Sequence, residues 1–224
     1  MHRTTLLAIG VIIIMLASGV ATYYFVTPKT NTRQIRVACV GDSITEGSGY
    51  PNKLNLLLGS NYTVRNFGVS GTEMALNLNK PYMNESKFQD ALNFDPDIIV
   101  IMLGTNDAKL DVAQNEQSFE ADYTQLVNSF QELAGDEQIF VVKSPPIFNN
   151  NANYSNTILA NTVIPHIDNL ANQMNLPTID IYDSLINHSD YFWDGVHPKS
   201  EGATIIASTV YNAITSQDSS GSTP

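Results

Sequence analysis

The sequence predicts a single α/β domain of three layers, in which a five-stranded parallel sheet lies between two layers of helices. Three observations lead to this fold class. From Gln34 onward, short apolar runs typical of strands alternate with longer stretches of helical periodicity. One run, Ile98–Leu103 (IIVIML), is apolar throughout, as expected of a parallel strand that is buried on both faces. The chain has 224 residues, of which 43% are hydrophobic, which suits one core of ordinary size.

Five short apolar runs account for the strands of this sheet. Each run is separated from the next by a stretch long enough for a helical crossover, which favours parallel pairing. The last run follows Pro177, a residue that a central strand does not tolerate, and we therefore expect it near an edge. The predicted strands are Ile35–Val40, Tyr62–Phe67, Ile98–Leu103, Ile139–Val142 and Thr178–Ile181.

Three stripes of apolar residues repeat at helical spacing, and we interpret them as faces that pack on the sheet. The first covers residues 119–133, and Gly135 follows it as a stop signal. The second covers residues 159–174 and contains Pro165, where we expect a kink. The third covers residues 203–214.

The first thirty residues are set apart by a long apolar segment. Leu6–Val26 contains no charged residue and would be about 31 Å long as a helix, enough to cross a hydrocarbon core. It fits an uncleaved membrane anchor, and it also fits a secretory signal with small residues near a cleavage site. We favour the anchor, because the hydrophobic region of a signal peptide is usually about 7–15 residues long.

The sequence predicts three parts of the chain. Residues 1–30 form the anchor or signal segment with a short linker, residues 31–215 the folded domain, and residues 216–224 a disordered tail. Lys29, Arg33 and Arg36 after the segment would, by the positive-inside rule, keep the domain in the cytoplasm. The charged start, apolar middle and small-residue end favour export, so we expect an extracytoplasmic, anchored domain, with secretion after cleavage as the alternative.

Charge and cysteine content exclude several classes of function. The net charge is −11 and no basic run occurs, which argues against binding nucleic acid through its phosphates. The single cysteine, Cys39, lies inside the first predicted strand and is expected to be a small buried residue. No spacing of Cys and His typical of a zinc site is present, so we expect no metal.

Four polar segments contain residue types used in catalysis. Three of them follow the first three predicted strands, and the fourth precedes the last predicted helix. Ligands of an open parallel sheet bind beyond the carboxyl ends of its strands, so these segments should share one edge. Each alone is a weak signal, but four in order are specific. They are Gly41-Asp42-Ser43-Ile44-Thr45-Glu46-Gly47, Asn66-Phe67-Gly68-Val69-Ser70-Gly71, Gly104-Thr105-Asn106-Asp107 and Asp194-Gly195-Val196-His197-Pro198.

These segments supply the parts of a serine nucleophile system. Ser43 needs a base within about 2.6–3.2 Å, and His197 is the best candidate. Asp194 precedes it by three residues and can hold the other ring nitrogen. The backbone N–H groups of Ser43 and Gly68 and the side-chain amide of Asn106 are the expected oxyanion donors.

The four segments resemble the signature blocks of the SGNH (GDSL) hydrolase family, whose name letters fall on Ser43, Gly68, Asn106 and His197. The resemblance spans about residues 35–214. It implies the family's flavodoxin-like α/β/α fold, a serine acyl-enzyme, and ester hydrolysis without metal or cofactor. Longer stretches such as IRVACVGDSITEG and DGVHP are similar to a branch of sialate and other carbohydrate O-acetylesterases, which implies a small-molecule or carbohydrate ester as the substrate.

Several other residues have both a functional and a structural interpretation. Ser70 also follows a strand, but Ser43 fits the family block better. Trp193 and His188 are candidate substrate contacts, although packing under the catalytic loop also explains Trp193. Asp42 and Asp107 are expected to bind backbone N–H groups at turns.

Two other functions remain open. The same catalytic residues would serve a lysophospholipase or an acyl thioesterase, which a nearby membrane would suit. A carbohydrate-binding module without activity is disfavoured, because binding needs no Ser, His and Asp in this arrangement. The loops 76–88 and 148–156 are expected to shape the pocket.

Overall fold

The computed structural model describes residues 16–17, 20–21, 33–111, 118–133, 137–150 and 152–218. Two units are distinguished, residues 1–33 and residues 34–224. In the first, β1 (Leu16–Ala17) and β2 (Val20–Ala21) pair antiparallel. The rest of the predicted anchor, Leu6–Val26, lies outside the described residues. Within the described residues, no helix combines the length and apolar character needed to span a bilayer.

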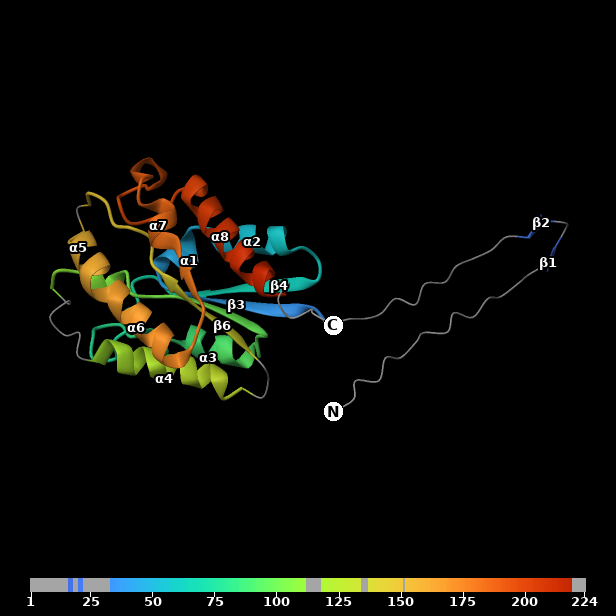
Figure 1. Ribbon diagram of the computed structural model, residues 1–224, viewed down its shortest axis with the longest axis horizontal. Helices are drawn as coiled ribbons and strands as arrows, with labels where there is room; N and C mark the ends of the chain where they lie inside the picture. Colours follow the sequence, from blue (N-terminus) through green and yellow to red (C-terminus); the bar gives the residue numbers. More distant parts are fainter. Residues whose placement is uncertain are drawn as a thin grey trace. The chain divides into compact units, whose positions relative to one another are not determined.

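The second unit is built on the predicted five-stranded parallel sheet (Figure 1). Its strand order is β4-β3-β5-β6-β7, so β3, the first strand of this sheet along the chain, pairs with β4 on one side and β5 on the other. This order is one of the two common doubly wound arrangements. The strands are β3 (Ile35–Gly41), β4 (Tyr62–Gly68), β5 (Ile98–Met102), β6 (Gln138–Lys143) and β7 (Thr178–Asp180).

Each predicted strand is confirmed to within a residue or two. All five residues of β5 are buried, as its continuous apolar run predicts. β7 lies at an edge and ends earlier than expected, because Asp180 caps the next helix by accepting a 2.8 Å hydrogen bond from the Asp183 N–H.

Helices cover both faces of the sheet, with α2, α7 and α8 on one side and α3, α4 and α6 on the other (Figure 1). Alternate residues of the strands serve the two layers. In β3, Val37 and Cys39 pack toward α2, α7 and α8, whereas Ala38 and Val40 pack toward the opposite layer. The helices are α1 (Ser43–Gly47), α2 (Tyr50–Leu58), α3 (Ser86–Asn93), α4 (Phe119–Gln131), α5 (Asn156–Ile158), α6 (Ile164–Met174), α7 (Ile181–Leu185) and α8 (Ser200–Asp218). Short 3₁₀ turns are η1 (Tyr82–Asn84), η2 (Asn106–Ala108) and η5 (Ser189–Tyr191).

The expected kink at Pro165 takes the form of a π-helical turn, η4 (Leu159–Val163), between α5 and α6. Proline has no N–H to donate, and its ring would collide with the carbonyl four residues earlier. The wider turn ahead of Pro165 accommodates both effects. At the carboxyl end of the chain α8 continues to Asp218, past the predicted end of the folded domain at residue 215.

Candidate active site

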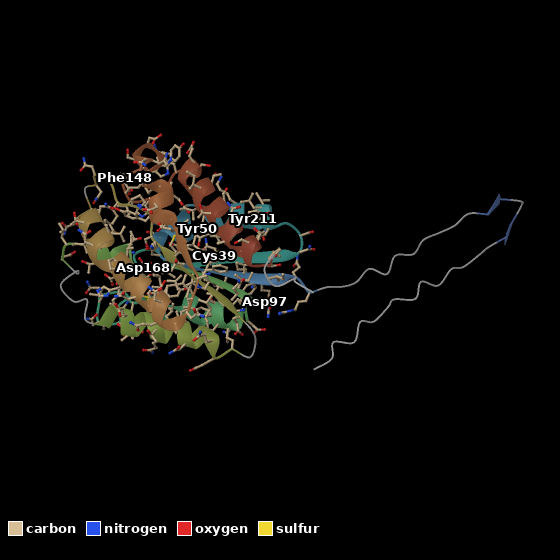
Figure 2. All side chains as sticks on the ribbon, in the orientation of Figure 1. Cys39, Tyr50, Asp97, Phe148, Asp168 and Tyr211 are labelled. Carbon is tan, nitrogen blue, oxygen red and sulfur yellow. The ribbon has the colours of Figure 1, made fainter. Side chains whose placement is uncertain are left out.

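The four polar segments meet at the carboxyl edge of the sheet. Gly41, at the end of β3, pairs with Gly68 of β4 on one side and with Met102 of β5 on the other. The segments that follow these three strands therefore begin side by side. Figure 2 shows Phe148, which follows β6, at the opposite end of the domain from Asp97, which precedes β5.

Ser43 is the first residue of α1, directly beyond β3. Asp42 begins the helix, because its carboxylate accepts a 2.9 Å hydrogen bond from the Ile44 N–H. This cap holds Ser43 at the rim of the sheet, where its side chain is half-buried. Ser43 Oγ lies 3.0 Å from His197 Nε2, within hydrogen-bonding distance.

His197 is held by a tight turn that begins at Asp194. Asp194 Oδ2 lies 2.7 Å from His197 Nδ1, and Oδ1 accepts hydrogen bonds from the N–H groups of Val196 (3.0 Å) and His197 (2.8 Å). Gly195 adopts φ +84°, a conformation that residues with a side chain rarely adopt. The Asp194 carboxylate therefore contacts both the imidazole of His197 and the backbone of the turn that carries it.

The pKa of Asp194 is low for the same reason. Partial burial by itself raises it, but the hydrogen bonds from His197 and Val196 and the nearby imidazole outweigh burial and lower the pKa to about 2. Asp194 is thus ionised at neutral pH. An ionised carboxylate at 2.7 Å is suited to fix the ring orientation of His197 and to stabilise its protonated form.

Asn106 lies in η2, beyond β5, and is 1% exposed. Its Nδ2 donates to the Thr72 carbonyl at 2.9 Å and lies 3.5 Å from Asp42 Oδ2. The second distance is long for a hydrogen bond, so one of the two amide protons is only loosely held. Asn106 Oδ1 accepts a 2.8 Å hydrogen bond from the Tyr154 hydroxyl.

Tyr154 is a site residue that the sequence did not predict. It lies in the loop 148–156 that we expected to shape the pocket, but nothing separates it from the other tyrosines of the chain. Burial, together with the carboxylates of Asp42, Asp194 and Glu73, raises the pKa of Tyr154 to about 12. Its hydroxyl therefore remains a proton donor at neutral pH.

Gly68 is constrained by packing against the start of α1. A β-carbon at this position would lie 2.3 Å from the Glu46 nitrogen, so only glycine fits. Its N–H donates to Asn66 Oδ1 at 2.8 Å, and this partner was not expected from the sequence. The Gly68 N–H is thus already engaged by a neighbouring side chain, and the role of Gly68 as an oxyanion donor remains a prediction.

The two aspartates next to the site both accept hydrogen bonds from backbone N–H groups, one from a nearby residue in the sequence and the other from distant residues. Asp42 caps the local turn as predicted, and burial raises its pKa to about 6. Asp107 also accepts hydrogen bonds from backbone N–H groups as predicted, and these belong to Met74 and Ala75 in a distant loop. Burial raises the pKa of Asp107 to about 7, although the hydrogen bonds from these two amides by themselves lower it.

Two cavities adjoin these residues. The smaller, of about 270 Å³, is lined by Ser43, His197, Ser70 and Trp193 among others. The larger, of about 820 Å³, is lined by Asp194, Trp193 and residues of the loop 148–152. Of the two loops expected to shape the pocket, 148–156 contributes to the larger cavity, and 76–88 contributes to neither.

The remaining candidates are placed as follows. The hydroxyl and N–H of Ser70 both donate to Glu46 Oε2, so this hydroxyl is engaged by a carboxylate although Ser70 lines the smaller cavity. The ring of His188 stacks on Tyr191 with 4.7 Å between centroids, and His188 lines neither cavity. Cys39 is fully buried as predicted. Among the described residues, no group of three or more His, Cys, Asp or Glu is arranged to hold a metal ion.

Comparison with known proteins gives a curated relative and several similar structures. An acetylxylan esterase from Xylanibacter ruminicola is 34% identical over 213 residues, which cover 84% of this chain and 44% of that protein. The chain thus spans less than half the length of this relative. A carbohydrate acetylesterase from Sinorhizobium meliloti has a similar structure, with 18% identity, a TM-score of 0.66 and coverage of 82% and 100% of the two chains. An M. smegmatis aryl esterase is similar too, with 19% identity, a TM-score of 0.66 and coverage of 81% and 99%.

These structures confirm the predicted three-layer fold. The family description "GDSL-like Lipase/Acylhydrolase" matches residues 39–205, which include all four polar segments. The match confirms the resemblance inferred from those segments. The chain belongs to the GDSL-like lipase/acylhydrolase family.

Proposed function

We propose that the protein is a serine esterase that removes acetyl groups from carbohydrate through Ser43, His197 and Asp194. One observation carries this proposal, namely the continuous chain of contacts from Ser43 Oγ to His197 Nε2 (3.0 Å) and from His197 Nδ1 to Asp194 Oδ2 (2.7 Å). A serine is a weak nucleophile unless a base removes its proton, and this geometry supplies one.

The reaction would proceed in two halves. In the first, Ser43 Oγ attacks the ester carbonyl while its proton passes to His197 Nε2, and His197 then returns that proton to the departing sugar hydroxyl. In the second, a water molecule loses a proton to His197 and attacks the acyl-enzyme carbonyl. The bond between the acyl carbon and Ser43 Oγ then breaks, His197 returns the proton to Oγ, and acetate is released. Asp194 stabilises the protonated imidazole in both halves.

The negative oxygen of each tetrahedral intermediate needs hydrogen-bond donors. The N–H of Ser43 is at the first position of α1, where a helix leaves this group without an internal partner. The loosely held amide proton of Asn106 is a second donor. Gly68 would join them only if the oxyanion displaces Asn66 Oδ1 from its N–H.

The size of the site and the curated relative support acetyl as the acyl group. The cavity beside Ser43 has a volume of about 270 Å³. This volume is sufficient for a short acyl group. The similar protein from Xylanibacter ruminicola is named an acetylxylan esterase, which supports an acetylated polysaccharide as the substrate.

The experiment measures kcat/KM of the full-length chain on p-nitrophenyl esters from acetate to dodecanoate. Ser43→Ala should abolish turnover, whereas Ser129→Ala, which removes a hydroxyl on the surface of α4, should not. A preference for acetate that depends on Ser43 supports the proposal. A maximum at long chains would favour a lysophospholipase or thioesterase, and turnover that survives in Ser43→Ala would refute the mechanism.

We also propose that the domain acts outside the cytoplasm, attached through Leu6–Val26. The support is the length and apolar composition of this segment. Fractionation of cells that express the full-length chain, with protease added to intact cells, tests this placement. A domain recovered in the cytosolic fraction and protected from protease would contradict it.

A further inference from the structure

The larger cavity next to the active site is not needed for the attack of Ser43 on an acetyl group. It has a volume of about 820 Å³ and lies beside the smaller one that contains Ser43. Trp193 lines both cavities, and Asp194 lines the larger one. A molecule bound in the larger cavity would thus extend to the edge of the catalytic residues.

The lining of this cavity combines aromatic rings with amide and hydroxyl groups. Phe148 and Phe192 pack edge to face, with ring centroids 4.9 Å apart. Trp193 is 75% exposed, and its backbone N–H donates a 2.9 Å hydrogen bond to the His197 carbonyl. An exposed aromatic ring on a backbone held in this way is suited to stack against the apolar face of a ligand.

Polar groups in the lining differ in their availability. Asn150 is occupied, since its side chain bonds the carbonyls of Phe148 and Tyr154 and so shapes the loop. The exposed side chain of Asn149 has no hydrogen-bond partner among the residues that the structure describes. Ser189 adds an exposed hydroxyl. An amide and a hydroxyl can each donate and accept, which matches the hydroxyl groups of a sugar.

The charge of the lining selects against anions. Asp194 is its one charged member among the described residues, and no Lys, Arg or His is included. The whole chain carries a net charge of −11. The Lys199 ammonium lies 5.6 Å from the centre of the Trp193 ring, but Lys199 does not line the cavity. A uronic acid or another anionic sugar would face the Asp194 carboxylate and the net negative charge of the chain, whereas a neutral sugar would not be repelled.

The cavity is also held firmly in place relative to the catalytic turn. Phe148 donates a 2.8 Å backbone hydrogen bond to the Gly195 carbonyl. The approach at Gly195 is so close that a β-carbon there would lie 2.4 Å from the Asn149 carbonyl oxygen. The loop that forms one wall therefore rests directly on the turn that holds Asp194 and His197.

We propose that this cavity binds a neutral sugar residue of the chain that carries the acetyl ester, with the Trp193 indole as a stacking platform and Asn149 as a hydrogen-bonding partner. The inference rests on the proposed function and specifies its substrate as a neutral oligosaccharide or polysaccharide rather than a single acetylated sugar. The sugar in this cavity positions its acetylated neighbour over Ser43.

The single tryptophan of the chain makes a direct binding test possible. Full-length Ser43→Ala protein is titrated with xylohexaose, with xylose and with trigalacturonic acid while the fluorescence of Trp193 is recorded. Xylohexaose should give a saturable change at lower concentration than xylose, and trigalacturonic acid should give none. The absence of a change with xylohexaose, or a stronger one with trigalacturonic acid, would overturn the proposal. A response to phosphatidylcholine vesicles but not to xylohexaose would overturn it in favour of a lipid contact.

Kinetics then separates this inference from the esterase function on which it rests. For each variant, kcat/KM on acetylated xylohexaose is divided by kcat/KM on p-nitrophenyl acetate, which carries no sugar residue for the larger cavity. This ratio should fall about 3- to 10-fold in Trp193→Ala and in Asn149→Ala, as loss of one stacking or polar contact predicts. It should be unchanged in Leu56→Ala, in which the exposed apolar residue lies on α2 and lines neither cavity.

A ratio that stays at the wild-type value in both Trp193→Ala and Asn149→Ala would refute the sugar site while leaving the esterase intact. Failure of the proposed function gives a different result. In that case the wild-type protein shows no turnover of p-nitrophenyl acetate that depends on Ser43, whatever xylohexaose does to the fluorescence.

Discussion

The hydroxyl of Tyr154 provides a sharp test of how the active site is held in place. It donates a 2.8 Å hydrogen bond to Asn106 Oδ1, which turns the opposite, Nδ2 end of the amide toward Thr72 and Asp42. Tyr154→Phe removes this hydroxyl and leaves a nearly fully buried oxygen without that partner. We expect the Asn106 amide to lose its fixed orientation, while the ring of residue 154 keeps its packing.

The size of the effect follows from the bond that is lost. A neutral hydrogen bond contributes about 0.5–1.5 kcal/mol net, and about 1.4 kcal/mol corresponds to a tenfold change in rate. We therefore expect kcat to fall about 2- to 10-fold in Tyr154→Phe. The largest possible effect is that of removing the Asn106 amide itself, and we expect Asn106→Ala to lower kcat by about 10²–10³.

The assay is steady-state hydrolysis of p-nitrophenyl acetate by the two single variants and the double variant. Because the interaction acts in the transition state, kcat should fall with little change in KM. If Tyr154 acts through Asn106, Tyr154→Phe should have little further effect once Asn106 is alanine. The high pKa of Tyr154 keeps its hydroxyl protonated, so the effect should be constant through the neutral pH range.

Tyr182→Phe is the matched control, because the Tyr182 hydroxyl accepts a 2.8 Å hydrogen bond from Asn156 and not from a residue of the active site. It should lower stability to a similar degree without changing kcat. Equal losses of kcat in Tyr154→Phe and Tyr182→Phe would show a general effect on the fold. Fully additive effects of Tyr154→Phe and Asn106→Ala would refute the positioning role.

Three further predictions concern stability and charge. Asp194→Asn should lower kcat on p-nitrophenyl acetate by about 10³–10⁴, because the carboxylate that orients His197 is lost, and a drop below tenfold would count against the triad. Because burial raises the pKa of Asp107 from 3.8 to about 7, the folded protein retains a proton that the unfolded chain releases, and the free energy of unfolding should fall as pH rises through this interval. Urea denaturation at each pH should show a shallower fall in Asp107→Asn, and parallel curves for the two proteins would contradict the assignment. Gly195→Ala places a β-carbon at φ +84° and 2.4 Å from a carbonyl oxygen, so it should cost at least about 1–2 kcal/mol, and an unchanged melting temperature would disprove the constraint.

The sequence alone determined the layers of the domain and the residues that meet at its active edge. Strand runs such as Ile98–Leu103 are visible because burial on both faces requires apolar side chains without interruption. Ser43, Asp194 and His197 could be predicted because two of them are three residues apart and the third directly follows a strand end. Local patterns of this kind reflect the burial and the spacing that a short segment needs in any fold of this class.

Only the tertiary structure decided how those segments are supported. Tyr154 contacts Asn106 across 48 positions of sequence, and Asp107 binds the backbone of a loop more than thirty positions away. The sequence also did not predict the hydrogen bond from the Gly68 N–H to Asn66, or the cavity between Trp193 and the loop 148–152. Loops have no periodicity from which their path can be derived, and a hydrogen bond between two of them depends on where the sheet and helices hold both. The contacts among Ser43, His197 and Asp194 could therefore be expected from the sequence, whereas the contact of Tyr154 with Asn106 and the second cavity required the folded structure.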